Sequence, residues 1–366
     1  MQFNIQREVL LKPLQQVIGV VERRQTLPVL SNLLVVAGEG SVRFTGTDLE
    51  VEMSASVEAQ AAQPGETTIP ARKLFDICRA LPDGSKISFK LSGDRMTVSS
   101  GRSRFTLATL AATEFPVIEN MDLVEQVSLP EATLKQLMDR TAFAMANQDV
   151  RYYLNGLLFD LREHALRCVA TDGHRLALAE TQLTEQRATQ RQIIIPRKGV
   201  LELQGLFESG DGNVDIEFGR NHIRIRRNDV VFTSKLIDGR FPDYEAVIPI
   251  GADQLVTIDR ELFRGALQRA AILSNEKYRG VKLEVSPNTL RIVAHNPEQE
   301  EAVEELEART LVNELSVGFN VNYLLDALNA LQGDEILLCL RDGNSSCLLR
   351  TPQSEDSRHV VMPLRL

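Results

Sequence analysis

The chain of 366 residues is too long for one ordinary hydrophobic core and fits two or three domains. Hydrophobic residues make up 43% and charged residues 25%, a balance that excludes a disordered or membrane-embedded protein. No apolar run approaches the roughly 20 residues that cross a bilayer, and the first residues lack the pattern of a secretory signal. Four scattered cysteines with no Cys-x-x-Cys pair predict reduced core thiols and a cytoplasmic protein.

The net charge of −9 argues against a surface coated with basic residues for nucleic acid. The charge is uneven, however, because 12 of the 41 basic residues and 18 of the 50 acidic residues follow position 250. The C-terminal third is therefore the most acidic part of the chain.

The predicted elements repeat three times along the chain. The first is a short alternating strand that runs into an amphipathic helix, beginning at residue 3, and its pattern returns at 127 and 256. The next landmarks recur at intervals of 124 residues, each in or after a strand-like run, and a second strand-helix pattern follows them. These landmarks are Asn32-Leu33-Leu34, Gly156-Leu157-Leu158 and Gly280-Val281-Lys282, and Thr47-Asp48, Thr171-Asp172 and His295-Asn296; the second strand-helix pattern aligns at Pro70, Pro196 and Asn320.

Each repeat thus contains two strand-helix units and several further short strands, which predicts an α+β fold with helices on one face of antiparallel sheet. We expect three domains, at 1–122, 123–250 and 251–366, with linkers near 119–125 and 248–254. A stripe at Leu74, Ile77, Cys78 and Leu81 illustrates the amphipathic helices.

Tandem domains of this kind can pair their edge strands, but a three-domain chain still has two free ends. The first repeat carries Lys73, Arg95, Arg102 and Arg104 beside apolar Phe105 and Leu107. The third carries the acidic run 296–305 and the apolar pair Ile272-Leu273. Opposite charges favour a head-to-tail contact, which closes into a ring or propagates as a filament. The alternative is that the acidic run is an ordinary solvated turn.

Basic residues also lie on the predicted helices. Arg72 and Arg79, seven residues apart, share a helix face away from the apolar stripe. If such helices line a ring, its channel would hold duplex DNA through phosphates without reading bases. The alternative is that helix surfaces are commonly rich in Lys and Arg.

Asp172 and His174 beside Thr171 allow a hydrolase hypothesis, but adjacency in sequence does not make a catalytic triad. A structural turn is the preferred interpretation. The histidines show no metal-ligand spacing, and there is no nucleotide-binding motif, so we expect no metal, cofactor or catalytic residue. Tyr152 and Tyr153 could stack on unpaired bases or pack within the domain.

Over its full length the sequence closely resembles the bacterial β sliding clamps. The resemblance is carried by Gly-Thr-Asp-Leu-Glu (46–50), Arg-Ser-Arg-Phe (102–105), Gln-Asp-Val-Arg-Tyr-Tyr-Leu-Asn-Gly (148–156), Ala-Thr-Asp-Gly-His-Arg-Leu (170–176), Pro-Arg-Lys-Gly (196–199), Asp-Gly-Arg-Phe-Pro-Asp-Tyr (238–244), Asn-Pro-Glu-Gln-Glu-Glu (296–301) and Val-Val-Met-Pro-Leu-Arg-Leu (360–366).

The resemblance implies a non-catalytic processivity factor, the β subunit of the replicative DNA polymerase III holoenzyme. Two three-domain copies would join head to tail into a ring of DNA-clamp domains around double-stranded DNA, with sheets outside and two helices per domain lining a central channel. A clamp loader would open the ring. The replicative polymerase, the loader, translesion polymerases and repair proteins would dock through short linear motifs.

The resemblance also implies roles for individual residues. DNA contacts fall on Arg24, Gln148, Tyr152, Tyr153, Arg197 and Lys198. Dimer contacts fall on Lys73, Arg95, Arg102, Arg104, Leu107, Ile272, Leu273, Glu298, Glu300, Glu301 and Glu304.

A hydrophobic peptide pocket between the second and third domains is implied as well. Its members by position are Leu154, Thr171, Gly173, His174, Arg175, Leu176, Pro242, Val247, Asn320, Tyr323, Ser346, Val360, Val361, Met362, Pro363, Leu364, Arg365 and Leu366. An apolar C-terminus containing Pro and Met suits an adaptable peptide site. Ala246, Asn344 and Leu364 depart from close relatives, and Val303 interrupts the acidic run. Two alternatives stay open: a paralogous clamp that acts as a resistance determinant, and a repeat scaffold that binds only proteins.

Overall fold

The computed structural model describes residues 1–21, 27–118, 122–185, 190–207 and 212–365. The chain forms two compact units, each of which is considered by itself. The first unit contains Met1–Ala132 and Lys198–Leu236, and the second contains Thr133–Arg197 and Ile237–Leu366. The predicted central repeat therefore contributes strands to both units.

Six α-helices occur in the described part of the chain, and each directly follows a strand, as the repeated strand-helix pattern predicts. None of these helices is long and apolar enough to cross a membrane. The helices are α1 (Arg7–Val17), α2 (Ala71–Ala80), α3 (Glu131–Asp139), α4 (Arg197–Leu206), α5 (Arg260–Ala270) and α6 (Val321–Ala330).

The first unit holds two antiparallel sheets. The five-stranded sheet ends at β9, and the eight-stranded sheet joins strands of the first and second repeats at the β17–β4 pair. In order, the smaller sheet is β5 (Gln60–Gln63), β1 (Gln2–Gln6), β7 (Lys86–Ser92), β8 (Arg95–Ser100) and β9 (Ser103–Ala108). The larger is β10 (Leu123–Pro130), β15 (Asn213–Gly219), β16 (His222–Arg227), β17 (Val230–Lys235), β4 (Val51–Glu58), β3 (Ser41–Thr47), β2 (Asn32–Ala37) and β6 (Gly65–Pro70).

The second unit has the same plan. Its nine-stranded antiparallel sheet joins the second and third repeats at the β13–β26 pair, and its four-stranded sheet ends at β21. In order, the larger sheet is β14 (Arg191–Pro196), β11 (Gly156–Leu161), β12 (Ala165–Thr171), β13 (Arg175–Gln182), β26 (Ser357–Val361), β25 (Cys347–Arg350), β24 (Glu335–Leu340), β18 (Gln254–Asp259) and β22 (Arg309–Thr310). The smaller is β21 (Glu301–Glu307), β20 (Thr289–His295), β19 (Gly280–Ser286) and β23 (Leu315–Asn320).

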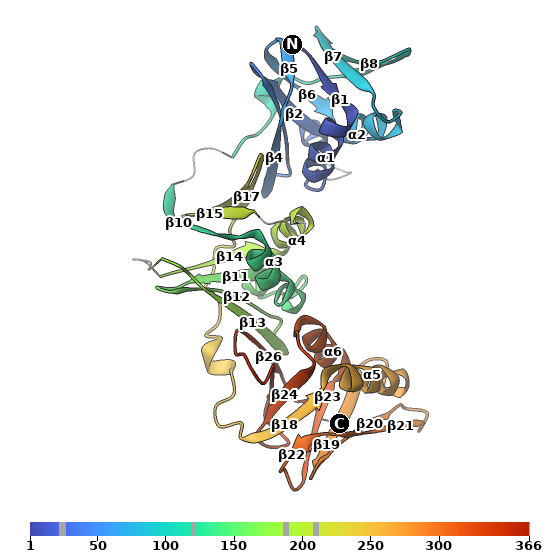
Figure 1. Ribbon diagram of the computed structural model, residues 1–366, viewed down its shortest axis with the longest axis vertical. Helices are drawn as coiled ribbons and strands as arrows, with labels where there is room; N and C mark the ends of the chain where they lie inside the picture. The colour runs from blue at the N-terminus through green and yellow to red at the C-terminus, as the bar shows by residue number, and fades with distance from the viewer. Residues whose placement is uncertain (22–26, 119–121, 186–189, 208–211, 366) are drawn as a thin grey trace. The chain divides into compact units, whose positions relative to one another are not determined.

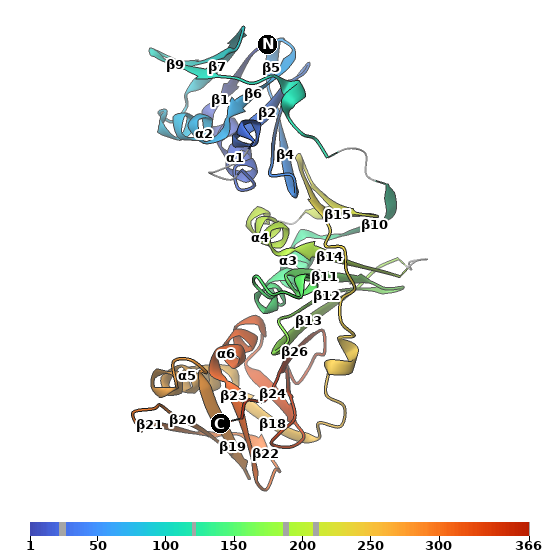
Figure 2. The same cartoon turned by 180° about the vertical axis from the view of Figure 1, so that it is seen from behind.

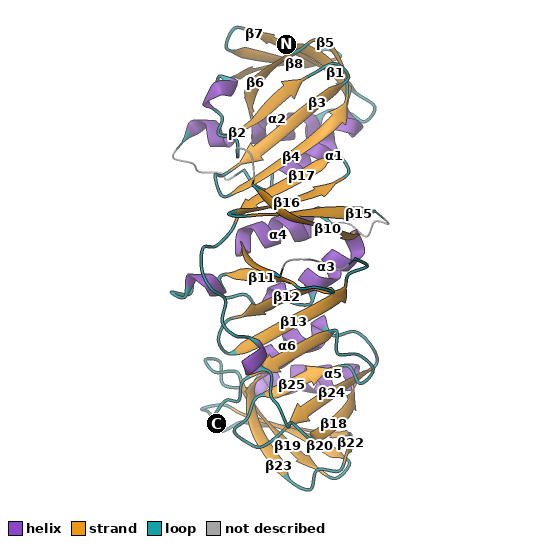
Figure 3. Cartoon of the chain, turned by 90° about the vertical axis from the view of Figure 1, so that its left-hand side faces the viewer, coloured by secondary structure: helices purple, strands orange, loops and turns teal. Residues whose placement is uncertain are grey.

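Alternating burial explains how the helices attach to the sheets. Along β4, Val51, Met53 and Ala55 are buried on the side where α1 packs, whereas the intervening side chains are partly exposed on the opposite face. Figure 3 shows β3, β4, β17 and β16 running side by side in front of α1 and α2. The first unit therefore has one helix-covered face and one face of polar side chains.

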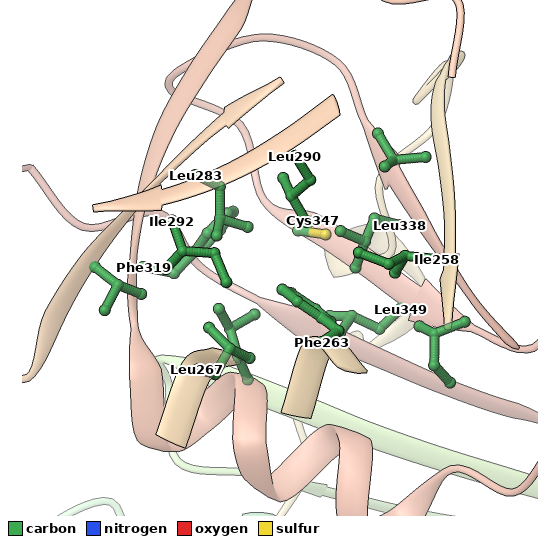
Figure 4. Packing of buried hydrophobic residues seen from close by; sticks show 14 of the residues in the cluster. Ile258, Phe263, Leu267, Leu283, Leu290, Ile292, Phe319, Leu338, Cys347 and Leu349 are labelled. Carbon is green, nitrogen blue, oxygen red and sulfur yellow. The ribbon is translucent and has the colours of Figure 1, made fainter. Parts of the chain in front are cut away.

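The third repeat shows the core most clearly. From α5, Phe263 and Leu267 point at the strands that carry Leu283, Ile292 and Phe319 (Figure 4), and all five side chains are fully buried. The helices α5 and α6 pack against each other, as both Figure 1 and Figure 2 show. Burying a residue of this size contributes about 1.5–3 kcal/mol, so these five side chains together stabilise the third repeat substantially.

Local signals fix where these elements begin. The Asp259 side chain accepts a hydrogen bond of 2.8 Å from the Leu262 amide at the start of α5, and Asn320 accepts one of 2.9 Å from the Asn322 amide at the start of α6. All four cysteines are buried and unpaired, as expected, and burial raises the pKa of Cys78 to about 12.

Candidate functional site

The two junctions between repeats are built alike. At the first, β17 pairs with β4 and Thr233 lies opposite Glu52; at the second, β26 pairs with β13 and Val360 lies opposite Leu176. Directly after the paired residues of β17 and β26, a backbone amide donates to a carbonyl in the turn before the neighbouring strand. Lys235 donates to the Glu50 carbonyl at 2.8 Å, and Met362 donates to the His174 carbonyl at 2.9 Å. The repeats therefore join in one common register.

The Thr-Asp landmark makes the turn at each junction. Asp172 Oδ1 accepts hydrogen bonds from the amides of His174 and Arg175 at 2.9 and 3.1 Å, and the Thr171 hydroxyl donates to the Arg175 carbonyl at 2.6 Å. Thr47 and Asp48 form the equivalent bonds in the first repeat. Because the backbone engages both hydroxyl and carboxylate, these groups do not converge with His174 into a triad.

Arg175 ties the second junction together. Its Nε contacts Asp172 at 3.1 Å, its Nη1 pairs with Asp326 of α6, and its Nη2 donates to the Phe143 carbonyl at 2.9 Å. The guanidinium also lies over the Tyr323 ring, 4.6 Å from its centroid. Sequence reasoning missed Asp326, which lies 151 residues from its partner.

The expected pocket residues include Arg175 itself and its neighbour Tyr323. We call the expected pocket residues other than Leu366 the second-junction patch; Leu366 lies outside the described residues. The His174 and Tyr323 rings stack with centroids 6.5 Å apart, and Met362 and Pro242 are exposed. Leu176 and Val360 pack with Phe241 and Tyr244 in one apolar cluster.

Some members of the patch are buried or hold its backbone in place through hydrogen bonds. Leu154 is 2% exposed and Val361 is 1% exposed, the latter within the core of the third repeat. Asn320 caps α6 and donates to the Tyr278 carbonyl at 3.3 Å, and Leu364 donates its amide to the Gly318 carbonyl at 2.8 Å. The remaining members, all partly or fully exposed, are Thr171, Gly173, Val247, Ser346, Pro363 and Arg365.

The first junction has no such apolar surface. In the shared register Glu52 replaces Leu176 and Thr233 replaces Val360. A polar cavity of about 340 Å³ lies there, lined by ten residues that include Ser54 and Arg224. Burial raises the pKa of Glu52, which accepts a hydrogen bond from the Ile118 amide at 3.1 Å. Of the two junctions, as far as the described residues show, the second is the one whose surface matches an apolar peptide.

The expected DNA contacts lie on helices, helix ends and one turn; Arg24 falls outside the described residues. On α2, Arg72 donates to the Val21 carbonyl at 3.1 Å, and Arg79 lies 3.4 Å from Asp76. Lys198 at the start of α4 pairs with the nearly buried Asp48. Helix-borne cations are thus present, and several are held by neighbours.

The two tyrosines differ in exposure. Tyr152 is 56% exposed, whereas Tyr153 packs against the apolar cluster of Leu176 and Val360. Both belong to a 3₁₀ turn, and their rings meet edge to face at 5.8 Å. Gln148 is exposed with a left-handed backbone (φ 58°), and Arg197 donates to the Met145 carbonyl at 3.1 Å. Tyr152 is the one of the pair available to a ligand.

Of the expected interface residues, Arg104 and Leu107 lie on the edge strand β9, and Glu301 and Glu304 lie on the edge strand β21. The others lie on α2 (Lys73), on β8 (Arg95), directly after α5 (Ile272 and Leu273) or in the turns before β9 and β21 (Arg102, Glu298 and Glu300). Within the whole set, Ile272 is 76% exposed, Leu107 is 8% exposed, and Glu304 is held by Arg269 through contacts of 2.7 and 2.9 Å. The sequence did not reveal this internal ion pair. The others are partly or fully exposed: Lys73, Arg95, Arg102, Arg104, Leu273, Glu298, Glu300 and Glu301.

No group of three His, Cys, Asp or Glu side chains that could hold a metal ion occurs within the described ranges. The geometry instead offers exposed sheet edges, helix-borne cations and one apolar patch.

Comparisons with known proteins agree with this arrangement. Three family models match the chain in succession: the DNA polymerase III beta subunit N-terminal domain at residues 1–119, its central domain at 128–243 and its C-terminal domain at 245–365. The beta sliding clamps of Pseudomonas putida and Escherichia coli K12 are 51% and 50% identical over 100% of both chains. The crystal structure of the Pseudomonas aeruginosa DNA polymerase III subunit beta superposes over 100% of both chains with a TM-score of 0.98 and 51% identity.

The chain therefore belongs to the DNA polymerase III β subunit family, the non-catalytic bacterial sliding clamps that confer processivity on the replicative polymerase.

Proposed function

We propose that two copies of this chain close head to tail into a ring around duplex DNA and hold the replicative polymerase on it. Each copy contributes three domains, at 1–122, 123–250 and 251–366, and the ring works in the cytoplasm without a cofactor. The ring retains DNA by topology, so its contacts with phosphates can stay weak and independent of sequence.

The observation that carries this proposal is the common register of the two internal junctions. At each, the edge strand of one repeat pairs antiparallel with the edge strand of the next. The same strand of the third repeat, β21, and the matching strand of the first, β9, are both edge strands in the described sheets. We infer that β21 of one chain pairs with β9 of another and so forms a third junction of the same kind.

The register of this third junction follows from the first. The hairpin β8–β9 closes at Ser100 and Ser103 as β16–β17 closes at Arg227 and Val230. Carrying over the β17–β4 pairing places Phe105 opposite Ala302, Thr106 opposite Glu301 and Arg104 opposite Val303.

Charge and polarity suit that pairing. Glu301 and Glu305 are exposed on β21 and would flank Arg104 of the partner diagonally, within reach of its long side chain. On the other face, Ala302 packs toward the third core and would meet Phe105 of the partner, with Ile272 and Leu273 nearby. The remaining charged residues, Lys73, Arg95, Arg102, Glu298, Glu300 and Glu304, would set orientation at the rim.

We further propose that the basic residues on the helices face the DNA, among them Arg24, Arg72, Arg79, Arg197 and Lys198, together with Gln148, Tyr152 and Tyr153. Attraction to phosphates would then occur inside a ring whose overall charge is negative, which limits unspecific binding elsewhere.

The second-junction patch is the proposed docking site for short linear motifs of the replicative polymerase, the clamp loader, translesion polymerases and repair proteins. An apolar surface with exposed Met362 and a stacked His174–Tyr323 pair suits an apolar peptide. The sliding clamps of Pseudomonas aeruginosa and Bartonella birtlesii have been crystallised with griselimycin. We propose that this chain binds griselimycin at the patch.

Topological release tests the ring. The protein is loaded onto nicked circular DNA with its clamp loader and ATP, separated by gel filtration, and then treated with a restriction enzyme that cuts the circle once. A ring stays with circular DNA and leaves linear DNA through its ends, whereas a scaffold that binds only proteins is never retained. Retention on linear DNA with free ends would contradict encirclement.

A further inference from the structure

The segment that follows the last strand of the central repeat crosses the sheet beside the second-junction patch (yellow in Figure 1). Phe241 and Tyr244 are 5% and 3% exposed and pack with Leu176 and Val360, which belong to the patch. Two other members of the patch, Pro242 and Val247, come from this same segment. The position of part of the docking surface therefore depends on what holds residues 241–248.

A buried polar network holds the segment at Tyr244. Its hydroxyl donates to Asp160 Oδ2 at 2.5 Å and accepts from Arg162 Nη2 at 2.8 Å and Arg167 Nη1 at 3.3 Å. Arg162 also donates to Asp160 at 2.9 Å, and both arginines contact Glu245, at 3.2 and 2.7 Å. The Tyr244 phenol, together with the more exposed Glu245 carboxylate, thus links the segment to strands β11 and β12.

The network needs an uncharged phenol. Asp160 is 3% exposed, and its carboxylate accepts hydrogen bonds from both the Tyr244 phenol and Arg162. Tyr244 is therefore the residue of the segment that provides this buried acceptor with a donor. Burial, reinforced by the hydrogen bond to Asp160, raises the pKa of Tyr244 to about 12, and the hydroxyl keeps its proton at neutral pH.

The first repeat lacks this anchor. Strand β2 pairs with β6 in the first repeat as β11 pairs with β14 in the second. This equivalence places Val36 of the first repeat at the position of Asp160 in the second. There Phe115 packs in a smaller cluster with Val29 and Leu30, without a buried phenol. The polar anchor and the apolar patch therefore occur together at the second junction.

We propose that Tyr244 is a positioning residue for docking: its hydroxyl fixes residues 241–248 on the sheet, so that Pro242 and Val247 form one rim of the second-junction patch. The inference rests on the proposed docking function. The phenol itself touches no partner; it acts by holding the rim in its binding position, which lowers the ordering cost of association.

The experiment compares griselimycin binding to full-length wild type, Tyr244→Phe and Arg167→Gln by calorimetry. Tyr244→Phe keeps the buried ring and removes only the hydroxyl, and Arg167→Gln weakens the same network from its partly exposed edge. We expect Tyr244→Phe to weaken binding about tenfold, the effect of one buried hydrogen bond, and Arg167→Gln to weaken it less. Amide exchange at Val247 and Ile248 should quicken in both variants.

Val285→Ala provides the matched control. Val285 is 1% exposed in the core of the third repeat, away from the segment, so its truncation lowers the melting temperature without moving the rim. This control should bind griselimycin as wild type does. Wild-type affinity in both Tyr244→Phe and Arg167→Gln would overturn the positioning role alone, as would equal weakening in Val285→Ala. A wild-type chain that fails to bind griselimycin would overturn docking at the patch, and the positioning role with it.

Discussion

Replacing Ile272 and Leu273 with Ala should convert the ring into monomers. Ile272 is 76% exposed in the single chain and Leu273 is partly exposed, so both side chains have apolar area to bury against a partner. Losing them removes about 2 and about 1 kcal/mol from each interface. Because dimerisation closes two interfaces at once, the loss is about 6 kcal/mol, or roughly four decades in the dissociation constant.

Light scattering coupled to gel filtration measures this effect directly across a dilution series. The variant should elute at the monomer mass of 40.8 kDa at concentrations where wild type has twice that mass. Leu311→Ala is the control, because Leu311 is 95% exposed in the same repeat but outside the proposed interface. A variant that stays dimeric at every dilution where wild type does would refute the assignment of the interface.

The double variant Phe105→Cys with Ala302→Cys should form a disulfide between protomers, because the carried-over register places these two positions opposite each other. The control Phe105→Cys with Val303→Cys should not form it. Equal cross-linking of both double variants on non-reducing gels would show that the register is wrong. Asp326→Asn should weaken griselimycin binding about fivefold, because it weakens the ion pair with Arg175 under the patch. An unchanged affinity by calorimetry would contradict this role of the ion pair. Burial raises the pKa of Glu202 above its ordinary value of 4.5, so its charged form costs stability at neutral pH. Glu202→Gln should therefore melt higher than wild type at pH 7, and the difference should close as the pH falls below 4.5; a gap that persists in acid would contradict this cause.

The α+β class and all six strand-helix units could be predicted from the sequence because they depend on local periodicity and on a repeated spacing. The Thr-Asp turns were recognisable for the same reason, although Leu49, with a left-handed φ of 80°, stands where the second repeat has Gly173. Local pattern thus captured the elements and their order.

Long-range pairs could not be predicted in this way. The contacts of Arg175 with Asp326, Arg269 with Glu304 and Tyr244 with Asp160 join residues 151, 35 and 84 positions apart. Nothing in the spacing of a single sequence distinguishes such partners from other charged or polar residues on neighbouring strands. Most individual site residues came from the family resemblance, whereas helix spacing suggested Arg72 and Arg79, and charge and polarity suggested several residues at the two chain ends. The roles of all of them remain predictions.

The unequal chemistry of the two internal junctions limits how many proteins can act at once. If the ring forms as proposed, it has six junctions between domains, and the apolar patch that contains Leu176 and Val360 occurs at two of them, once per subunit. The polymerase, the clamp loader and repair proteins would then compete for two docking sites. Which of them acts on the DNA would depend on how fast each dissociates from a docking site and on its local concentration.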